Sequence, residues 1–421
     1  MRNKKRFFNN LVTYVMVIIV YLVAQAAMSG DYEGFTMGRL LMKQMVPVCV
    51  YVVLAVSLNL VVGISGELSL GHAGFMSVGA FGGIITGAWV ERMSRFVDET
   101  GAFAELVKNE ETWQSFFFEV AKKSGVTYIQ WSDTVVLVIA IIAGGILAGI
   151  AGFVIGIPAL RLRGDYLAIV LLAFGEIIRN VLNCVYVSIT ETTLNFSLEL
   201  SGSAPVLEKG TEAILKGPQG TVSNVLAKGT KAIPERFLVG FILVMFTLIV
   251  VLNLINSRSG RAIMAIRDNR IAAESVGLKV MKYKMMAFVT GAALAGMAGA
   301  LFGLNLGSIK SDMFDYNKSI EILVMVVLGG IGSIRGSVIA AVLLTLLPEQ
   351  LRFLQDYRML VYAIVLIVVM LATNSPILKK LWALLLRIKP LAVAVDKIKA
   401  TKKKLLGKIF PKKAAKAGDV K

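Results

Sequence analysis

Four polar side chains share one face of an otherwise apolar stretch, residues 165–187. Their three- and four-residue spacing brings them together if the stretch is a helix. Ionisable groups inside a membrane are costly and normally face the interior of a helix bundle or a wet cavity. A charged pair here would either brace the helix or line a polar pathway, and the spacing leaves both open. The four residues are Glu176, Arg179, Asn180 and Asn183.

Residue types that support enzyme chemistry are scarce in this sequence. The single histidine, His72, excludes histidine triads and histidine metal clusters. The two cysteines, Cys49 and Cys184, lie in apolar stretches and give no support to a disulfide framework or a cysteine metal site. No GxxxxGK(S/T) phosphate loop, GxSxG motif or HExxH motif occurs. We therefore expect no catalytic residue, no metal site and no ATPase site on this chain.

The composition is typical of a membrane protein with several spans. Hydrophobic residues make up 56% of the 421 residues, and the formal net charge is +18. Most of that charge lies in the C-terminal tail, and lysines beside spans usually face anionic lipid on the cytoplasmic side. We therefore expect contact with membrane lipids rather than nucleic acid. The chain divides into a transmembrane domain, 1–378, and a basic cytoplasmic tail, 379–421.

Apolar runs predict about ten membrane-spanning helices, with both termini in the cytoplasm. Two short runs, 319–334 and 336–347, are separated by glycines, a feature that transporters place near a pathway. Merging them is the nine-span alternative, which would put the Lys-rich tail outside. Asn59, in the second run, is a further pathway candidate. The ten runs are 11–28, 45–64, 70–90, 134–157, 165–187, 237–256, 285–307, 319–334, 336–347 and 357–373.

Small residues recur at four-residue spacing in several of these runs. Membrane helices pack through such stripes because hydrophobicity cannot drive them together within lipid. We expect helix packing here, with direct contact to a transported molecule as the alternative. The glycines concerned are Gly79, Gly83, Gly87, Gly291, Gly299 and Gly303.

A polar loop, residues 257–284, lies between the sixth and seventh runs. It holds seven Lys or Arg residues against two acidic residues, which predicts a cytoplasmic location. Two short helices, 261–266 and 269–276, are expected within it. A structured loop of this kind suggests a docking surface for something outside the membrane. The boundary signals are Asp268 or Asn269 as an N-cap and Gly277 as a stop.

Four stretches resemble the permease subunits of branched-chain amino-acid ABC importers, most closely the M-type subunit of the Liv system. The similarity extends over residues 45–373, and RLRGDYLAI with GEIIR is its most specific part. It implies an all-α polytopic membrane protein whose permease fold is similar to the cobalamin-importer type. The four stretches are 57–81, 158–179, 260–301 and 326–341.

The resemblance also implies partners. This chain would pair with a homologous H-type permease, two ATP-binding subunits that carry ATP and Mg²⁺, and an extracytoplasmic amino-acid-binding protein at the plasma (inner) membrane. Loop 257–284 corresponds to the family's coupling loop and would pass rigid-body displacement from the ATPases to the spans. The implied coupling residues are Arg261, Arg267, Asp268, Arg270, Ala273, Glu274 and Gly277.

Two departures from the family pattern fall in the predicted outer insertions, 91–133 and 188–235. The first is longer than expected, and the second displaces a GGPNG-like motif, whose nearest match is 217–220. Both insertions lie where a binding protein would dock, so they bear on substrate and partner. The alternatives are a permease for sugars, nucleosides or other amino acids on the same scaffold, and an ion-coupled secondary transporter.

Overall fold

The structure is a computed structural model. The chain forms two compact units, Met1–Arg352 and Phe353–Lys421. The helices and strands described below belong to the first unit. The predicted span 357–373, apart from five single positions, and the tail 379–421 lie outside the described residues, as does most of insertion 91–133. The described residues are 13–22, 24–25, 39–100, 133–162, 164–190, 193–198, 211–222, 233–350, 357, 360, 363, 364 and 367.

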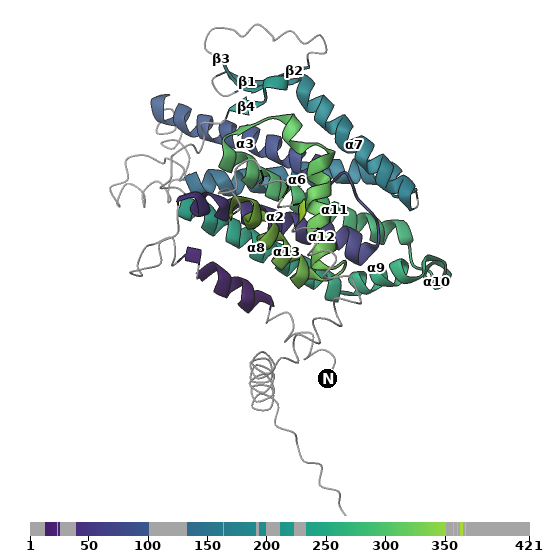
Figure 1. The fold of residues 1–421 in the computed structure, drawn as a ribbon. Helices are drawn as coiled ribbons and strands as arrows, with labels where there is room; N and C mark the ends of the chain where they lie inside the picture. The colour runs from purple at the N-terminus through teal and green to yellow at the C-terminus, as the bar shows by residue number, and fades with distance from the viewer. Residues whose placement is uncertain are drawn as a thin grey trace, which may run out of the picture. The chain divides into compact units, whose positions relative to one another are not determined.

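Within the part of the chain that the structure describes, six helices are long and apolar enough to cross a membrane (Figure 1). They agree with the second to seventh predicted runs, and a shorter apolar helix, Thr13–Leu22, lies in the first. The total of ten spans stays a prediction. The six are α2 (Arg39–Asn59, continued by the π-helix η1, Leu60–Ser65), α3 (His72–Thr100), α6 (Asp133–Ala159), α7 (Asp165–Cys184), α8 (Ile233–Asn256) and α11 (Val280–Leu306).

The two short glycine-separated runs form two separate helices, α12 (Tyr316–Gly329) and α13 (Ile334–Gln350). The two helices pack closely where they meet. A Cβ atom added at Gly336 would lie less than 3.0 Å from the Gly329 backbone, so only glycine fits there. The turn between them needs glycine, since Gly330 and Gly332 have φ of 92° and 83°. The two runs are therefore separate helices, and whether each crosses the membrane stays a prediction.

The structure corrects the all-α expectation, because insertion 188–235 contributes to a five-stranded antiparallel sheet. The fifth run is helical only to Cys184, where the chain passes directly into the sheet. The physical reason is the alternating β-branched and aromatic sequence VYVSIT, which suits a half-buried strand. In the order β2-β1-β3-β4-β5, the strands are Thr193–Leu198, Val185–Thr190, Thr211–Lys216, Thr221–Val222 and Ser308–Ile309.

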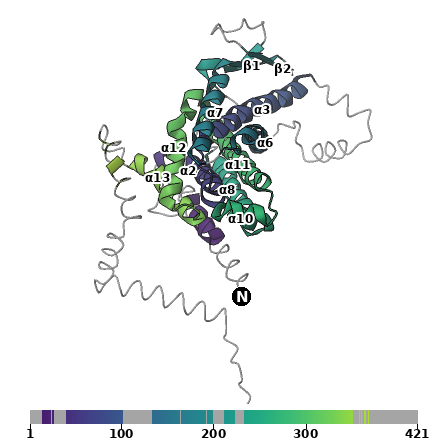
Figure 2. The ribbon, with the colours of Figure 1, turned by 90° about the vertical axis from the view of Figure 1, so that its right-hand side faces the viewer.

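Two short helices, α9 (Arg258–Asp268) and α10 (Arg270–Ser275), form most of loop 257–284. They project from the helix bundle at one end, whereas the sheet lies at the other end (Figures 1 and 2). The predicted outer insertion and the predicted cytoplasmic loop therefore lie at opposite ends of the bundle.

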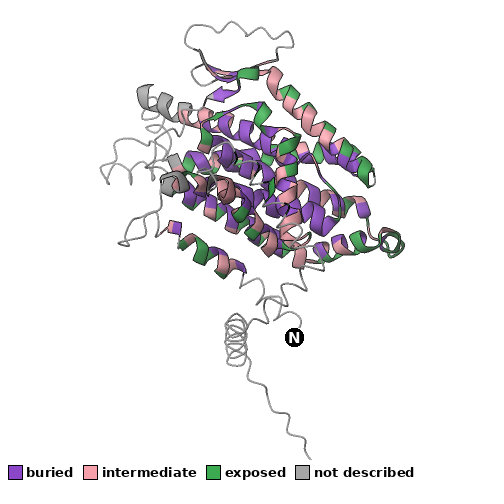
Figure 3. Cartoon of the chain, viewed as in Figure 1, coloured by how far each residue is buried: buried purple, intermediate pink, exposed green. Residues whose placement is uncertain are grey.

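α11 is the centre of the bundle and packs against α3 and α6 (Figure 3). The three backbones meet where glycines remove the side chains: a Cβ at Gly79 would lie under 3.0 Å from Gly296, and one at Gly144 under 3.0 Å from Gly79. Gly83, Gly291 and Gly299 are equally tight, whereas Gly303 sits at the 3.0 Å limit. Gly87 differs, because its nearest neighbour atoms would be 3.6 Å from an added Cβ.

These distances predict that two glycines of the same stripe respond differently to one added methyl group. We expect Gly79→Ala to lower the free energy of unfolding by about 1–3 kcal/mol, as overpacking does. Gly87→Ala is the matched control on the same helix and should be neutral or slightly stabilising, since alanine is the better helix former. Thermal unfolding of the detergent-solubilised protein measures both, and equal effects would contradict the packing described above.

Candidate functional site

The α9–α10 pair, which we call the knob, has well-defined helix ends. Ser257 Oγ accepts a hydrogen bond from the Gly260 amide at 3.1 Å, and Asn269 Oδ1 accepts one from the Ala272 amide at 3.1 Å. Both are N-caps that satisfy amides left free by the first helical turn. Gly277 then ends the segment with φ of 84°, a conformation that favours glycine. The predicted cap Asn269 and stop Gly277 are therefore confirmed.

The knob has a small core of its own. Ile266, Ala273 and Val280 are buried together, with Leu278 and Tyr283 packed against them. These residues come from α9, α10 and the start of α11, so the two short helices are held onto the next long helix. The knob is therefore built as a rigid projection rather than a loose connection.

Charged residues predicted for coupling lie on or near the knob surface. Arg270 Nε donates to Glu274 Oε1 at 2.9 Å, an exposed pair one helical turn apart. Arg267 pairs with the neighbouring Asp268 at 3.0 Å. Arg261, also exposed, donates to the Asn256 carbonyl at 3.2 Å. Exposed contacts of this kind contribute little to stability, so Arg261, Arg270 and Glu274 remain available to a partner.

Two apolar side chains on the knob were missed by the sequence reasoning. Ile271 is 80% exposed and Val276 is 81% exposed. The signal was present, because both are β-branched residues in or beside a short helix of a strongly polar loop. Large apolar groups that a structured projection presents to water are typical of protein contact sites.

Arg267 also joins the knob to the bundle. Its Nη1 donates to the Gly63 carbonyl at 2.7 Å, at the end of the π-helix η1. Beside it, Lys284 at the start of α11 pairs with Glu67, and both side chains are only 10% exposed. These contacts join residues more than 200 positions apart in the sequence.

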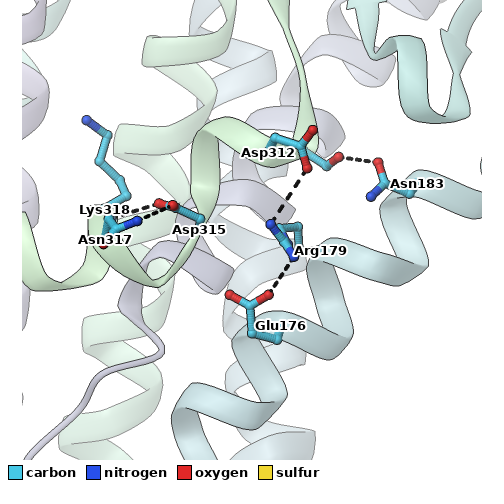
Figure 4. Close-up of polar contacts among 8 residues, drawn as sticks. Glu176, Arg179, Asn183, Asp312, Asp315, Asn317 and Lys318 are labelled. Carbon is cyan, nitrogen blue, oxygen red and sulfur yellow. Dashed lines mark hydrogen bonds and ion pairs between the residues drawn. The ribbon is translucent and has the colours of Figure 1, made fainter.

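The polar face of α7 meets the segment η4 (Ser311–Phe314), which follows β5 (Figure 4). Arg179 lies between two carboxylates, 2.9 Å from Glu176 and 3.7 Å from Asp312. Asn183 accepts a hydrogen bond from Ser311, which belongs to η4. The pairing that the bracing interpretation requires is present, yet Glu176 and Arg179 keep 29% and 28% exposure. A pathway role for this face stays a prediction.

The other predicted pathway residues are placed differently. Asn180 is exposed. Asn59 is fully buried, donates to Ser337 Oγ at 2.7 Å and accepts from the Gly332 amide at 2.8 Å. Asn59 therefore connects α2 to the turn between α12 and α13.

The displaced GPQG sequence lies at the end of α7. It forms the turn η2 (Gly217–Gln219), where a Cβ at Gly217 would lie 2.7 Å from the Asn183 carbonyl. A Cβ at Gly220 would lie under 3.0 Å from the Ile309 carbonyl in β5. The inserted residues include the β1–β2 hairpin, which leads the chain away from α7 and back again. The GPQG turn therefore contacts the end of α7 although it lies more than 30 residues further along the chain.

Comparisons with known proteins agree with this architecture. Residues 40–370 match the family described as the branched-chain amino acid transport system permease component. The permease protein LivM of the high-affinity branched-chain amino acid transport system of Escherichia coli K12 is 37% identical over 241 residues, which is 54% of either chain. This chain thus spans about half the length of this relative and of LivM from Salmonella typhimurium.

Two shorter similarities involve other permeases. The permease protein LivH of the same Escherichia coli transport system is 35% identical over 88 residues, 21% of this chain and 28% of LivH. The fructose import permease protein FruG of Bifidobacterium longum is 32% identical over 97 residues, 22% of this chain and 28% of FruG. No solved structure matches this chain.

The caps of the knob support a direct test of its rigidity. Asn269→Ala should remove the α10 cap, which is worth about 1 kcal/mol, and raise the amide hydrogen exchange of residues 270–276 roughly fivefold. Asn269→Asp keeps a side-chain acceptor and is the matched control. Exchange measured by mass spectrometry should change only for the alanine variant. Unchanged exchange in Asn269→Ala would show that the knob does not depend on this cap.

Proposed function

Because the chain belongs to the family of branched-chain amino acid transport system permease components, we propose that it is the membrane subunit of an ATP-driven importer of leucine, isoleucine, valine or related apolar amino acids. The observation that carries the proposal is the knob, a capped helix pair with its own core and two exposed apolar side chains. Such a projection can receive force from a separate protein, whereas a loose connection would absorb it.

In this proposal the knob docks on ATP-binding subunits, which hold ATP and Mg²⁺. Ile271 and Val276 supply the buried contact, and Arg261 and Arg270 supply its charged rim. Closure of the ATPases moves the knob, and the bundle alternates between outward-open and inward-open states. The α7 face with Glu176 and Arg179 lies along the route for a zwitterionic substrate, whose carboxylate and ammonium groups match both charges.

We propose further partners by the same reasoning. A second, homologous permease would complete the membrane unit, which the similarity to LivH as well as LivM supports. An extracytoplasmic binding protein would deliver the substrate to the end of the bundle that carries the sheet. This orientation places the knob and both termini in the cytoplasm, as the basic residues of loop 257–284 favour.

The substrate class has one specific competitor, since FruG imports fructose according to its name. The deciding experiment reconstitutes this chain with its partner permease, ATPases and binding protein in vesicles and measures ATP-dependent uptake. Labelled leucine, isoleucine and valine should accumulate, and labelled fructose should not. Accumulation of fructose alone would favour the sugar permease, and leucine accumulation by this chain without ATP would favour an ion-coupled transporter.

The docking proposal predicts that a charge at the exposed apolar positions separates the subunits. Ile271→Asp and Val276→Asp should each lower the amount of co-purified ATPase about tenfold, because the contact would bury an unpaired carboxylate. Phe196→Asp is the control, since Phe196 is 67% exposed on strand β2 at the opposite end of the bundle. ATPase recovery equal to that of the wild type in both knob variants would exclude this docking surface.

A further inference from the structure

The segment between α2 and α3, residues 60–71, contains neither α-helix nor β-strand, and we refer to it as segment 60–71. It begins as the π-helix η1, turns at Gly66 with φ of 78°, and reaches α3 without regular structure. Most of it is buried, including Glu67 and Ser69. π-helical turns are rare and often mark functional positions. We infer that segment 60–71 is the mechanical link that carries displacement of the knob to the turn between α12 and α13.

Arg267 on the knob and Lys284 on the adjoining α11 hold this segment at two points. The Gly63 carbonyl lies in the last turn of η1, where carbonyls lack a partner within the helix, and it accepts the 2.7 Å hydrogen bond from Arg267. The side chain of Arg267 lies directly over Gly66, because a Cβ there would approach Arg267 Cγ closer than 3.0 Å. One arginine therefore contacts both ends of a four-residue turn.

The second point is the buried ion pair between Glu67 and Lys284. Separating two buried charges leaves each without compensation, which is strongly unfavourable. Glu67 must therefore follow Lys284 when the start of α11 moves. Lys284 adjoins the knob core through Tyr283, so the knob and segment 60–71 move together.

Asn59 and Gly63 contact the turn between α12 and α13 and the start of α13. Asn59, immediately before η1, donates to Ser337 Oγ and accepts from the Gly332 amide. A Cβ at Gly63 would lie under 3.0 Å from the Gly332 backbone. Gly63 thus contacts Arg267 through its carbonyl and Gly332 through its α-carbon face. Gly63 therefore connects the knob directly to the α12–α13 turn.

This inference rests on the proposed function, and it assigns Arg267 and Asn59 as positioning residues for transport. The test uses the complete complex in vesicles and measures three quantities: leucine uptake, ATP hydrolysis and their ratio. Arg267→Ala should retain ATPase binding and ATP hydrolysis, and lower uptake per ATP on the order of tenfold. Arg267→Lys keeps a cationic donor for the Gly63 carbonyl and should restore part of the ratio.

Two further variants make the result specific. Arg258→Ala removes an exposed arginine at the other end of α9 and should leave the ratio unchanged. Asn59→Leu breaks the link at the far side with an apolar side chain of similar size, so it should also lower uptake per ATP about tenfold while ATP hydrolysis persists. Asn59→Leu also decides the question if Arg267→Ala fails to assemble.

The outcomes separate this inference from the proposed function. If the wild-type complex imports leucine and both Arg267→Ala and Asn59→Leu keep its uptake per ATP, segment 60–71 is not the link and the proposed function stands. A wild-type complex that imports no branched-chain amino acid overturns the proposed function, and this inference with it. A reduced ratio in both variants, with Arg258→Ala unaffected, supports the link.

Discussion

The contact that the bundle depends on is the backbone approach of α3, α6 and α11 at Gly79, Gly144 and Gly296. Lipid is as apolar as leucine, so helices in a bilayer gain little from hydrophobicity when they associate. They associate through dispersion between closely packed atoms, which falls away over fractions of an ångström. Three backbones can reach this distance only where no side chain intervenes. The rigidity of α11, which begins at the knob and ends at the sheet, follows from this contact.

Several buried polar groups in the bundle form hydrogen bonds between segments, since lipid supplies none. The partners concentrate where helices are interrupted. Asn59, just before η1, bonds Gly332 in the other irregular turn, and Ser57 lies 2.8 Å from His72 at the start of α3. The Asn59 side chain thus satisfies a backbone amide in the turn between α12 and α13. Irregular backbone at membrane depth is tolerated only when buried in this way, which explains why the two breaks lie together.

The sequence predicted features that depend on neighbouring residues and missed those that depend on distant ones. The cap at Asn269 and the stop at Gly277 are local, and both were found. The pairing of β4 with β5 joins strands almost 90 positions apart, and the bond from Arg267 to Gly63 spans 204 positions. The spacing of a glycine stripe predicts the packed face of a helix but not the distance between helix axes, so it could not distinguish Gly87 from Gly79.

The strands of insertion 188–235 lie at the end of the bundle opposite the knob (Figure 1). Added residues in a surface loop cost little closure entropy, and the β1–β2 hairpin returns the chain so that Gly217 reaches the end of α7. β4 then pairs with β5, directly after α11. α11 has 27 residues and is therefore about 40 Å long at 1.5 Å per residue, enough to cross the bilayer. One packed helix thus connects the knob to the sheet, so a tilt imposed at one end must displace the other.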